Sequence, residues 1–92
     1  RNRRIRTARR KLKEARKLFN SMGDLEGISG VDFNEALVNI EDNRRDASIT
    51  SFDNAMRFPL QYYPKREERW NVFRDRFQEK GWVLPNHLKT PP

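Results

Sequence analysis

Hydrophobic positions recur along the first 22 residues at alternating intervals of three and four, the spacing of one face of an α-helix. These positions are Ile5, Ala8, Leu12, Ala15, Phe19 and Met22. No Gly or Pro interrupts them, and the stretch is rich in strong helix formers. We therefore predict a helix from about Asn2 to Met22, ended by Gly23. The stripe is narrow, and it packs either on the domain's own core or, in part, on another protein.

Three glycines follow this helix, and they predict a linker before a second one. They are Gly23, Gly27 and Gly30. We assign residues 23–31 to the linker. Asp32 has the character of an N-cap, and Glu35 stands three residues later, as in a capping box. The second helix is therefore expected to start at Phe33 and to end near Arg44–Arg45.

A third helix is predicted because the apolar positions change phase near residues 46–48. The candidate caps are Ser48, Thr50 and Ser51. Pro59 is expected to end this helix, since the residue before a proline is pushed toward extended geometry. One long bent helix is the alternative, because neither Gly nor Pro lies between residues 31 and 58.

The C-terminal third predicts a fourth helix and an extended tail. Pro64 suits the first turn of the helix, and Gly81 ends it. Trp70, Phe73 and Phe77 mark its buried face. The chain is thus predicted to be a small all-α domain of three or four helices. Its parts are a basic helix (1–22), a Gly-containing linker (23–31), a helical core (32–80) and an extended Pro-rich tail (81–92).

Positive charge is concentrated at the N-terminus. Ten of the first 17 residues are Lys or Arg and one is acidic, which gives this arm +9, whereas the whole chain carries +7. Such a stripe is either a solvated helix face or a surface for a polyanion or an acidic protein, and its density favours binding. The candidate partner-binding residues are Arg9, Arg10, Lys13, Arg16 and Lys17. Alternatively, the acidic segment 24–53, with net charge −6, folds back and neutralises the arm.

Aromatic residues cluster between positions 62 and 82. Tyr62, Tyr63 and Trp70 are candidate anchors for a partner, because such residues dominate binding hot spots. Core packing is the default interpretation for Trp70, and base stacking is the nucleic-acid alternative. Pro64 is either an ordinary trans helix boundary or a slow switch on which a prolyl isomerase acts.

The sequence shows no pattern of catalytic or metal-binding residues. The single histidine, His87, has no carboxylate or cysteine at ligand spacing and is expected to be an exposed polar residue. There is no Gly-rich phosphate loop, and the absence of cysteine excludes disulfides and Cys-bound zinc. We expect neither enzymatic activity nor a cofactor or metal. The longest apolar run has three residues, which is too short to span a membrane.

Two stretches, RTARRKLKEARKLF at residues 6–19 and QYYPKREERW at residues 61–70, give the chain a resemblance to a phage family. With the small size and the lack of enzyme motifs, they resemble the small anti-RecBCD (Abc-type) accessory proteins of lambdoid phages. The resemblance implies a non-catalytic inhibitor that acts in the bacterial host cytoplasm. It would dock on the RecC subunit of the RecBCD exonuclease/helicase and modulate DNA recombination. It also implies that a host prolyl isomerase acts at Pro64.

The rival function is a small basic nucleic-acid-binding protein or a ribosomal or other ribonucleoprotein component. Such proteins commonly carry basic arms and extended tails that both meet phosphate. Here the tail after Lys80 carries a single cation, Lys89. This asymmetry favours a protein partner over direct binding to nucleic acid.

Overall fold

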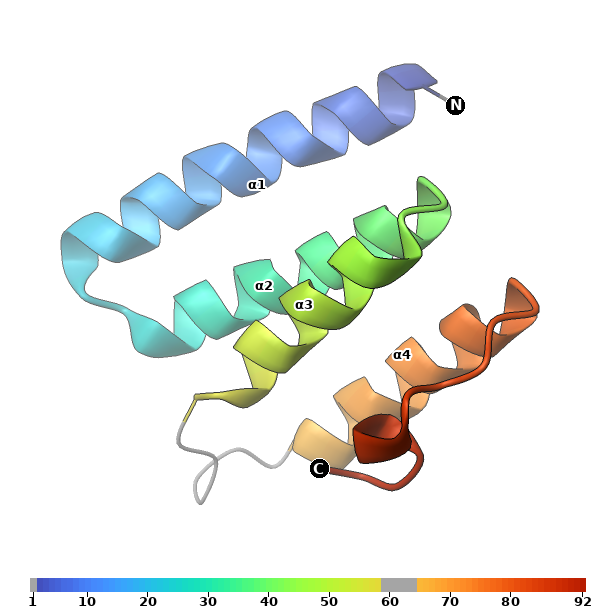
Figure 1. Cartoon of the computed structure of the whole chain (residues 1–92). Helices are drawn as coiled ribbons and strands as arrows, with labels where there is room; N and C mark the ends of the chain where they lie inside the picture. Colours follow the sequence, from blue (N-terminus) through green and yellow to red (C-terminus); the bar gives the residue numbers. More distant parts are fainter. Residues whose placement is uncertain (1, 59–64) are drawn as a thin grey trace.

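The computed structural model describes residues 2–58 and 65–92, and those residues form four α-helices and no strand (Figure 1). This confirms the predicted all-α class. The elements are α1 (Asn2–Met22), α2 (Leu25–Glu41), α3 (Arg45–Met56), α4 (Arg66–Glu79) and a short 3₁₀ helix, η2 (Asn86–Leu88). Helices α1, α2 and α3 run antiparallel in succession, and α4 packs against both α2 and α3.

Helix α1 has the predicted bounds, and Gly23 ends it with a left-handed φ of 66°. The predicted linker over residues 23–31 is wrong, because α2 begins at Leu25. Asp24 is its N-cap, and its side chain accepts a hydrogen bond from the Gly27 amide at 2.9 Å. Asp32 lies inside the helix instead of capping it, so the predicted capping box does not form.

Two glycines stand inside α2 although glycine disfavours helices by about 1 kcal/mol relative to alanine. At Gly27, the ring of Phe19 from α1 occupies the space that a Cβ atom would need. This close approach explains why the residue is glycine and why a local interpretation of the sequence mistook the segment for a linker.

The boundary between α2 and α3 also lies earlier than predicted. Helix α2 ends at Glu41, and Asn43 takes a left-handed φ of 60°. Asparagine is one of the few non-glycine residues that adopt this conformation readily. Ser48 is fully buried in α3, where its hydroxyl donates to the Arg45 carbonyl at 2.6 Å, so it does not cap the helix. Pro59, the predicted end of the third helix, lies outside the described residues.

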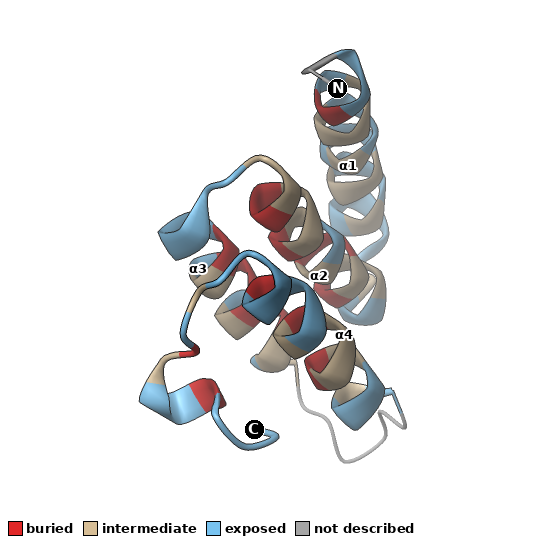
Figure 2. Cartoon of the chain, turned by 90° about the vertical axis from the view of Figure 1, so that its right-hand side faces the viewer, coloured by how far each residue is buried: buried red, intermediate tan, exposed pale blue. Residues whose placement is uncertain are grey.

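The hydrophobic core lies between α2, α3, α4 and the C-terminal tail (Figure 2). Trp70, Phe73 and Phe77 are 6%, 0% and 0% exposed, which confirms the predicted buried face of the fourth helix. Phe73 stacks on Phe52 of α3 with ring centroids 4.2 Å apart. Full burial of one such side chain is worth roughly 1.5–3 kcal/mol. This set of aromatic rings therefore joins the three helices.

The tail after Gly81 was predicted to be extended. In the structure it folds back on the core instead. Leu84 and Leu88 are 6% and 1% exposed, and η2 turns the chain between them. The indole N–H of Trp70 donates to the Leu88 carbonyl at 2.9 Å. The two leucines give the tail an apolar side that packs against α4, and this burial outweighs the extended preference of the prolines.

Helix α1 lies outside this core and packs against the side of α2 (Figure 1). Ile5 is buried and the stripe from Ala8 to Phe19 is half-buried, whereas Met22 is exposed. Most of the stripe thus packs on α2 and not on the central core, and its half-buried members keep some exposed surface. Within the described ranges, no helix is long and apolar enough to cross a membrane.

Candidate binding surface on the basic helix

Eight of the nine cations of α1 fall into two sets, and the ninth, Lys11, lines a hollow beside α2. One set lies beside α2 and makes specific contacts with it; we call it the inner arginines, and it consists of Arg4, Arg9 and Arg16. The other set is exposed and lies on the side of the helix opposite its apolar stripe; we call it the outer face, and it consists of Arg3, Arg6, Arg10, Lys13 and Lys17. The two sets have different roles.

Two inner arginines each bridge a pair of side chains on α2. One Nη atom of Arg9 donates to the Asn39 amide oxygen and to the Asp42 carboxylate, both at 2.9 Å. One Nη atom of Arg16 donates to Asp32 at 2.6 Å and to Glu35 at 2.8 Å. The third, Arg4, pairs with Glu41.

The Arg16 cluster is the most strongly coupled of these contacts. Burial disfavours the charged guanidinium, but the hydrogen bonds to Glu35 and Asp32 outweigh it and raise the pKa of Arg16 above its ordinary value. The Asp32 side chain is 12% exposed, so removal of the arginine would leave a carboxylate with little water around it. Arg16 therefore acts as a structural link between α1 and α2.

The side chains of α2 that accept these hydrogen bonds form a polar stripe, which the sequence analysis did not recognise. Asp32, Glu35, Asn39 and Asp42 recur at intervals of three, four and three, so they lie on one face of the helix. Their partners Arg9 and Arg16 stand seven residues apart, two turns of α1. This matched spacing was the signal that could have found them. The acidic segment does fold back on the arm, where it pairs with the inner arginines.

The outer face keeps its charge. Its five cations follow intervals of three, four, three and four, and all are exposed. Arg10 pairs with Glu14 at 3.3 Å on the surface, where both side chains are more than 60% exposed. The other four have no hydrogen bond or ion pair with any residue that the structure describes. The face is thus a row of solvent-exposed cations about 21 Å long.

This charge does not stabilise the helix that carries it. Like charges three or four residues apart repel one another by a few tenths of a kcal/mol per pair. The first turn of α1 has no acidic residue and its last turn has no basic one, so the charges also oppose the helix dipole. A row of cations that opposes folding is more readily explained by binding than by support of the fold.

The structure sorts the predicted partner-binding residues into three groups. Arg10, Lys13 and Lys17 lie on the outer face, whereas Arg9 and Arg16 are occupied by α2. Trp70 is buried in the core, where the guanidinium of Arg74 lies 4.7 Å from its ring centroid, so it is not an exposed anchor. The remaining two, Tyr62 and Tyr63, lie outside the described residues, as does Pro64, the predicted target of a prolyl isomerase.

The described residues also show little that could support chemistry. His87 is exposed, as predicted, but its Nε2 atom lies 3.0 Å from a carboxylate oxygen of Asp53, a contact that the sequence did not suggest. Across residues 2–58 and 65–92, no group of three or more His, Cys, Asp or Glu side chains is placed to hold a metal. The outer face of α1 is therefore the candidate functional site.

No protein-family model, curated protein or solved structure matches this chain.

Proposed function

We propose that this chain is a non-catalytic accessory protein that binds a host DNA-processing complex through the outer face of α1. The observation that carries the proposal is the division of charge. The inner arginines pair with polar side chains of α2. The outer face keeps five exposed cations, which destabilise α1 through their mutual repulsion. The resemblance to the Abc-type phage proteins supplies the candidate partner, RecBCD, with RecC as the docking subunit.

The row of cations suits an extended anionic surface. Three of its members are arginines, whose planar guanidinium groups bind carboxylates or phosphates through two parallel hydrogen bonds. Long-range attraction would speed association and orient the helix, with less effect on the final affinity. Once bound, the protein would act by occupancy, changing how the complex engages DNA without a chemical step of its own.

The proposed prolyl isomerase partner is a separate part of the proposal, with no support from the outer face. It depends on the resemblance and on Pro64, which lies outside the described residues. Recovery of an isomerase together with the DNA-processing complex, and its loss for Pro64→Ala, would support this part of the proposal. Failure of this part would leave the proposal for the outer face intact.

The proposal is tested first by capture from bacterial lysate. The tagged chain is incubated with nuclease-treated lysate, and the bound proteins are identified by mass spectrometry. Purified RecBCD is then titrated onto the immobilised chain. We expect Arg10→Glu with Lys13→Glu to weaken binding at least about tenfold, equivalent to about 1.4 kcal/mol. Arg9 is unsuitable for this test, because its hydrogen bonds to α2 would be lost as well.

The matched control is Arg57→Glu with Lys89→Glu, which reverses the same charge at two exposed positions away from α1. Equal weakening by both double variants would show that net charge, and not the outer face, governs binding. Loss of every partner after nuclease treatment, with nucleic acid recovered before it, would favour the rival function, a small basic nucleic-acid-binding or ribonucleoprotein component.

A further inference from the structure

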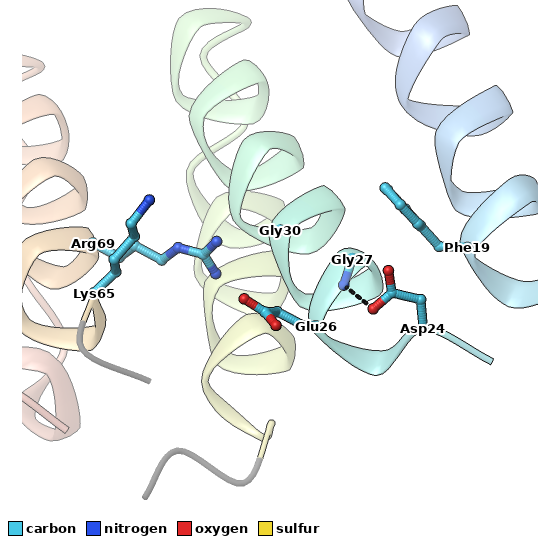
Figure 3. Close-up of a pocket in the computed structure, with 7 residues that line it drawn as sticks. All are labelled: Phe19, Asp24, Glu26, Gly27, Gly30, Lys65 and Arg69. Atoms are coloured by element: carbon cyan, nitrogen blue, oxygen red, sulfur yellow. Dashed lines mark hydrogen bonds between the residues drawn. The ribbon is translucent and has the colours of Figure 1, made fainter. Parts of the chain in front are cut away.

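Three hollows lie in line along the side of α2 that is open between α1 and α4. Two adjoin near its C-terminal half; they measure about 360 and 340 Å³ and share Leu37, Glu41 and Arg76. The third, about 420 Å³, lies at the N-terminal half of α2 (Figure 3). We call the three together the trough. Its floor is the α2 stripe Gly27, Gly30, Asn34, Leu37 and Glu41.

The floor of the trough suits the apolar side of another helix. Its residues follow intervals of three and four, so they present one continuous face of α2. Leu37 and Ile40 of α2, with Ala8 and Leu12 of α1, supply apolar surface in the two adjoining hollows. At the other end Phe19 covers Gly27, and the floor is low only at Gly30. Grooves of this kind hold the apolar face of an amphipathic helix.

The walls of the trough carry an excess of positive charge on both sides. Figure 3 shows Lys65 and Arg69 extending from α4 toward α2, opposite Phe19 of α1. Arg76 also lines the trough from α4, and Lys11 lines it from α1. Arg69 donates to the Ser29 hydroxyl at 3.3 Å. No ion pair with a described residue is formed by Lys11, Lys65 or Arg76.

Acidic side chains in the trough do not balance these cations. Glu41 pairs with Arg4, and Asp24 is the N-cap of α2. Two further carboxylates, Glu26 and Glu79, line the opposite ends. Six cations against four carboxylates line the three hollows, so an occupant with acidic flanks would meet a net positive charge, most of it on the α4 wall.

We propose that the trough binds an acidic amphipathic helix of a partner protein. Its apolar face would lie on the floor and its Asp and Glu side chains would meet the two walls. Helix α2 has 17 residues and is about 25 Å long, which matches an occupant of four to five turns. A nucleic acid fits less well, because apolar side chains of α1 and α2 line the two adjoining hollows. Phe19 is the one aromatic side chain on which a base could stack among the described residues that line the trough.

The trough and the outer face are separate sites. Lys11 and Arg76 belong to the trough, whereas Arg10 and Lys13 belong to the outer face and line none of its three hollows. The two proposals can therefore fail independently, and the variants below distinguish them.

The test uses a hydrocarbon-stapled helical peptide as long as α2, with leucines at intervals of three and four and glutamates on both flanks. One control peptide carries lysine in place of glutamate, and a second contains the same residues in scrambled order. Binding to the full chain is followed by fluorescence anisotropy and by amide chemical shifts. We expect saturable binding with shifts at Asn34, Leu37 and Lys11. Both control peptides should bind at least about tenfold more weakly.

Two variants test the position of the peptide. A Cβ atom at Gly30 would meet only the flexible end of Arg69, at 3.6 Å, so Gly30→Gln should fold and should obstruct the trough. Lys11→Glu with Arg76→Glu reverses one charge on each wall. Each change should weaken peptide binding at least about tenfold. Arg57→Glu with Lys89→Glu and Arg10→Glu with Lys13→Glu should both leave it unchanged.

The proposal is overturned if the acidic peptide shows no saturable binding, or if the scrambled peptide binds equally well. Chemical-shift changes centred on the outer face, with none at Asn34 or Leu37, would also overturn it. A single-stranded DNA oligonucleotide that shifts these floor residues and binds more tightly than the peptide would assign the trough to nucleic acid instead.

Discussion

Arg16 is the side chain that most directly ties the basic helix to the rest of the domain. Its guanidinium donates to both Asp32 and Glu35, and this pairing raises its pKa. A group whose pKa is raised on folding stabilises the native state at every pH below its unfolded value, and this contribution falls as pH rises through the folded value. For an arginine both values are strongly alkaline, so the contribution of Arg16 stays constant through neutral and mildly alkaline pH.

Replacement of this side chain by an apolar one of similar length should therefore destabilise the domain. We expect Arg16→Met to lower the free energy of unfolding by about 1–3 kcal/mol, because Asp32 is left with little solvent and no cation. Urea denaturation followed by circular dichroism measures the loss. Lys17→Met is the control; this exposed side chain should change stability by no more than about 0.5 kcal/mol. Equal losses for both variants would contradict a structural role for Arg16.

The two glycines of α2 should respond to alanine with opposite signs. Alanine favours a helix over glycine by about 1 kcal/mol, and Gly30→Ala should gain most of this because its Cβ atom has room. Gly27→Ala should lose about 1–3 kcal/mol, since the new methyl group would displace the ring of Phe19. Thermal unfolding of both variants measures the difference. A stabilised Gly27→Ala would show that α1 packs less closely on α2 than the structure indicates.

At the scale of single elements, the tail acts as a fourth packing segment of the core. Leu88 is 1% exposed, and its carbonyl receives the indole N–H of Trp70. We expect Leu88→Ala to lower the free energy of unfolding by about 2–5 kcal/mol through the cavity that it creates. The emission of Trp70 should also shift to longer wavelength as water reaches the indole.

Val83 provides the matched control for the tail. It is 72% exposed although it precedes the buried Leu84 in the same segment. Val83→Ala should leave the unfolding midpoint in urea and the tryptophan emission nearly unchanged. If Leu88→Ala behaved in the same way, the tail would not belong to the cooperative core.

Elements whose boundaries depend on local signals could be predicted from the sequence. The bounds of α1 follow from its uninterrupted helix formers and from Gly23, and the buried face of α4 follows from Trp70, Phe73 and Phe77. The start of α2 could not be predicted, because Gly27 is helical where Phe19 of another helix covers it. The fold of the tail likewise depends on contacts with residues far away in the sequence.

The candidate site shows the same limit. The excess of cations in α1 is plain from composition, but Arg10 and Arg16 have the same local character. Only the position of α2 separates them, because Arg16 faces Asp32 and Glu35 while Arg10 faces solvent.

At the scale of the whole molecule, the fold separates a stable core from a charged helix attached to its side. Helices α2, α3 and α4 share the aromatic core with the tail, whereas α1 packs on α2 through a narrow stripe and the inner arginines. The charges of the outer face therefore lie away from the core and have little effect on its stability. The repulsion among its cations destabilises mainly α1. A substitution that relieves this repulsion is therefore predicted to raise stability and to weaken binding.

Lys13→Glu should make the free protein more stable and the complex weaker. In the native chain Lys13 repels Arg10 and Lys17, which stand three residues before it and four after it. A glutamate at this position attracts both, so we expect the free energy of unfolding to rise by about 1 kcal/mol. Binding to the partner captured by the tagged chain should weaken, and its dependence on salt should become less steep. Lys13→Gln should lie between the two in both measurements. A variant that gains stability and binds unchanged would reduce the outer face to a solvated surface, whereas the predicted trade-off is expected of charge retained for binding.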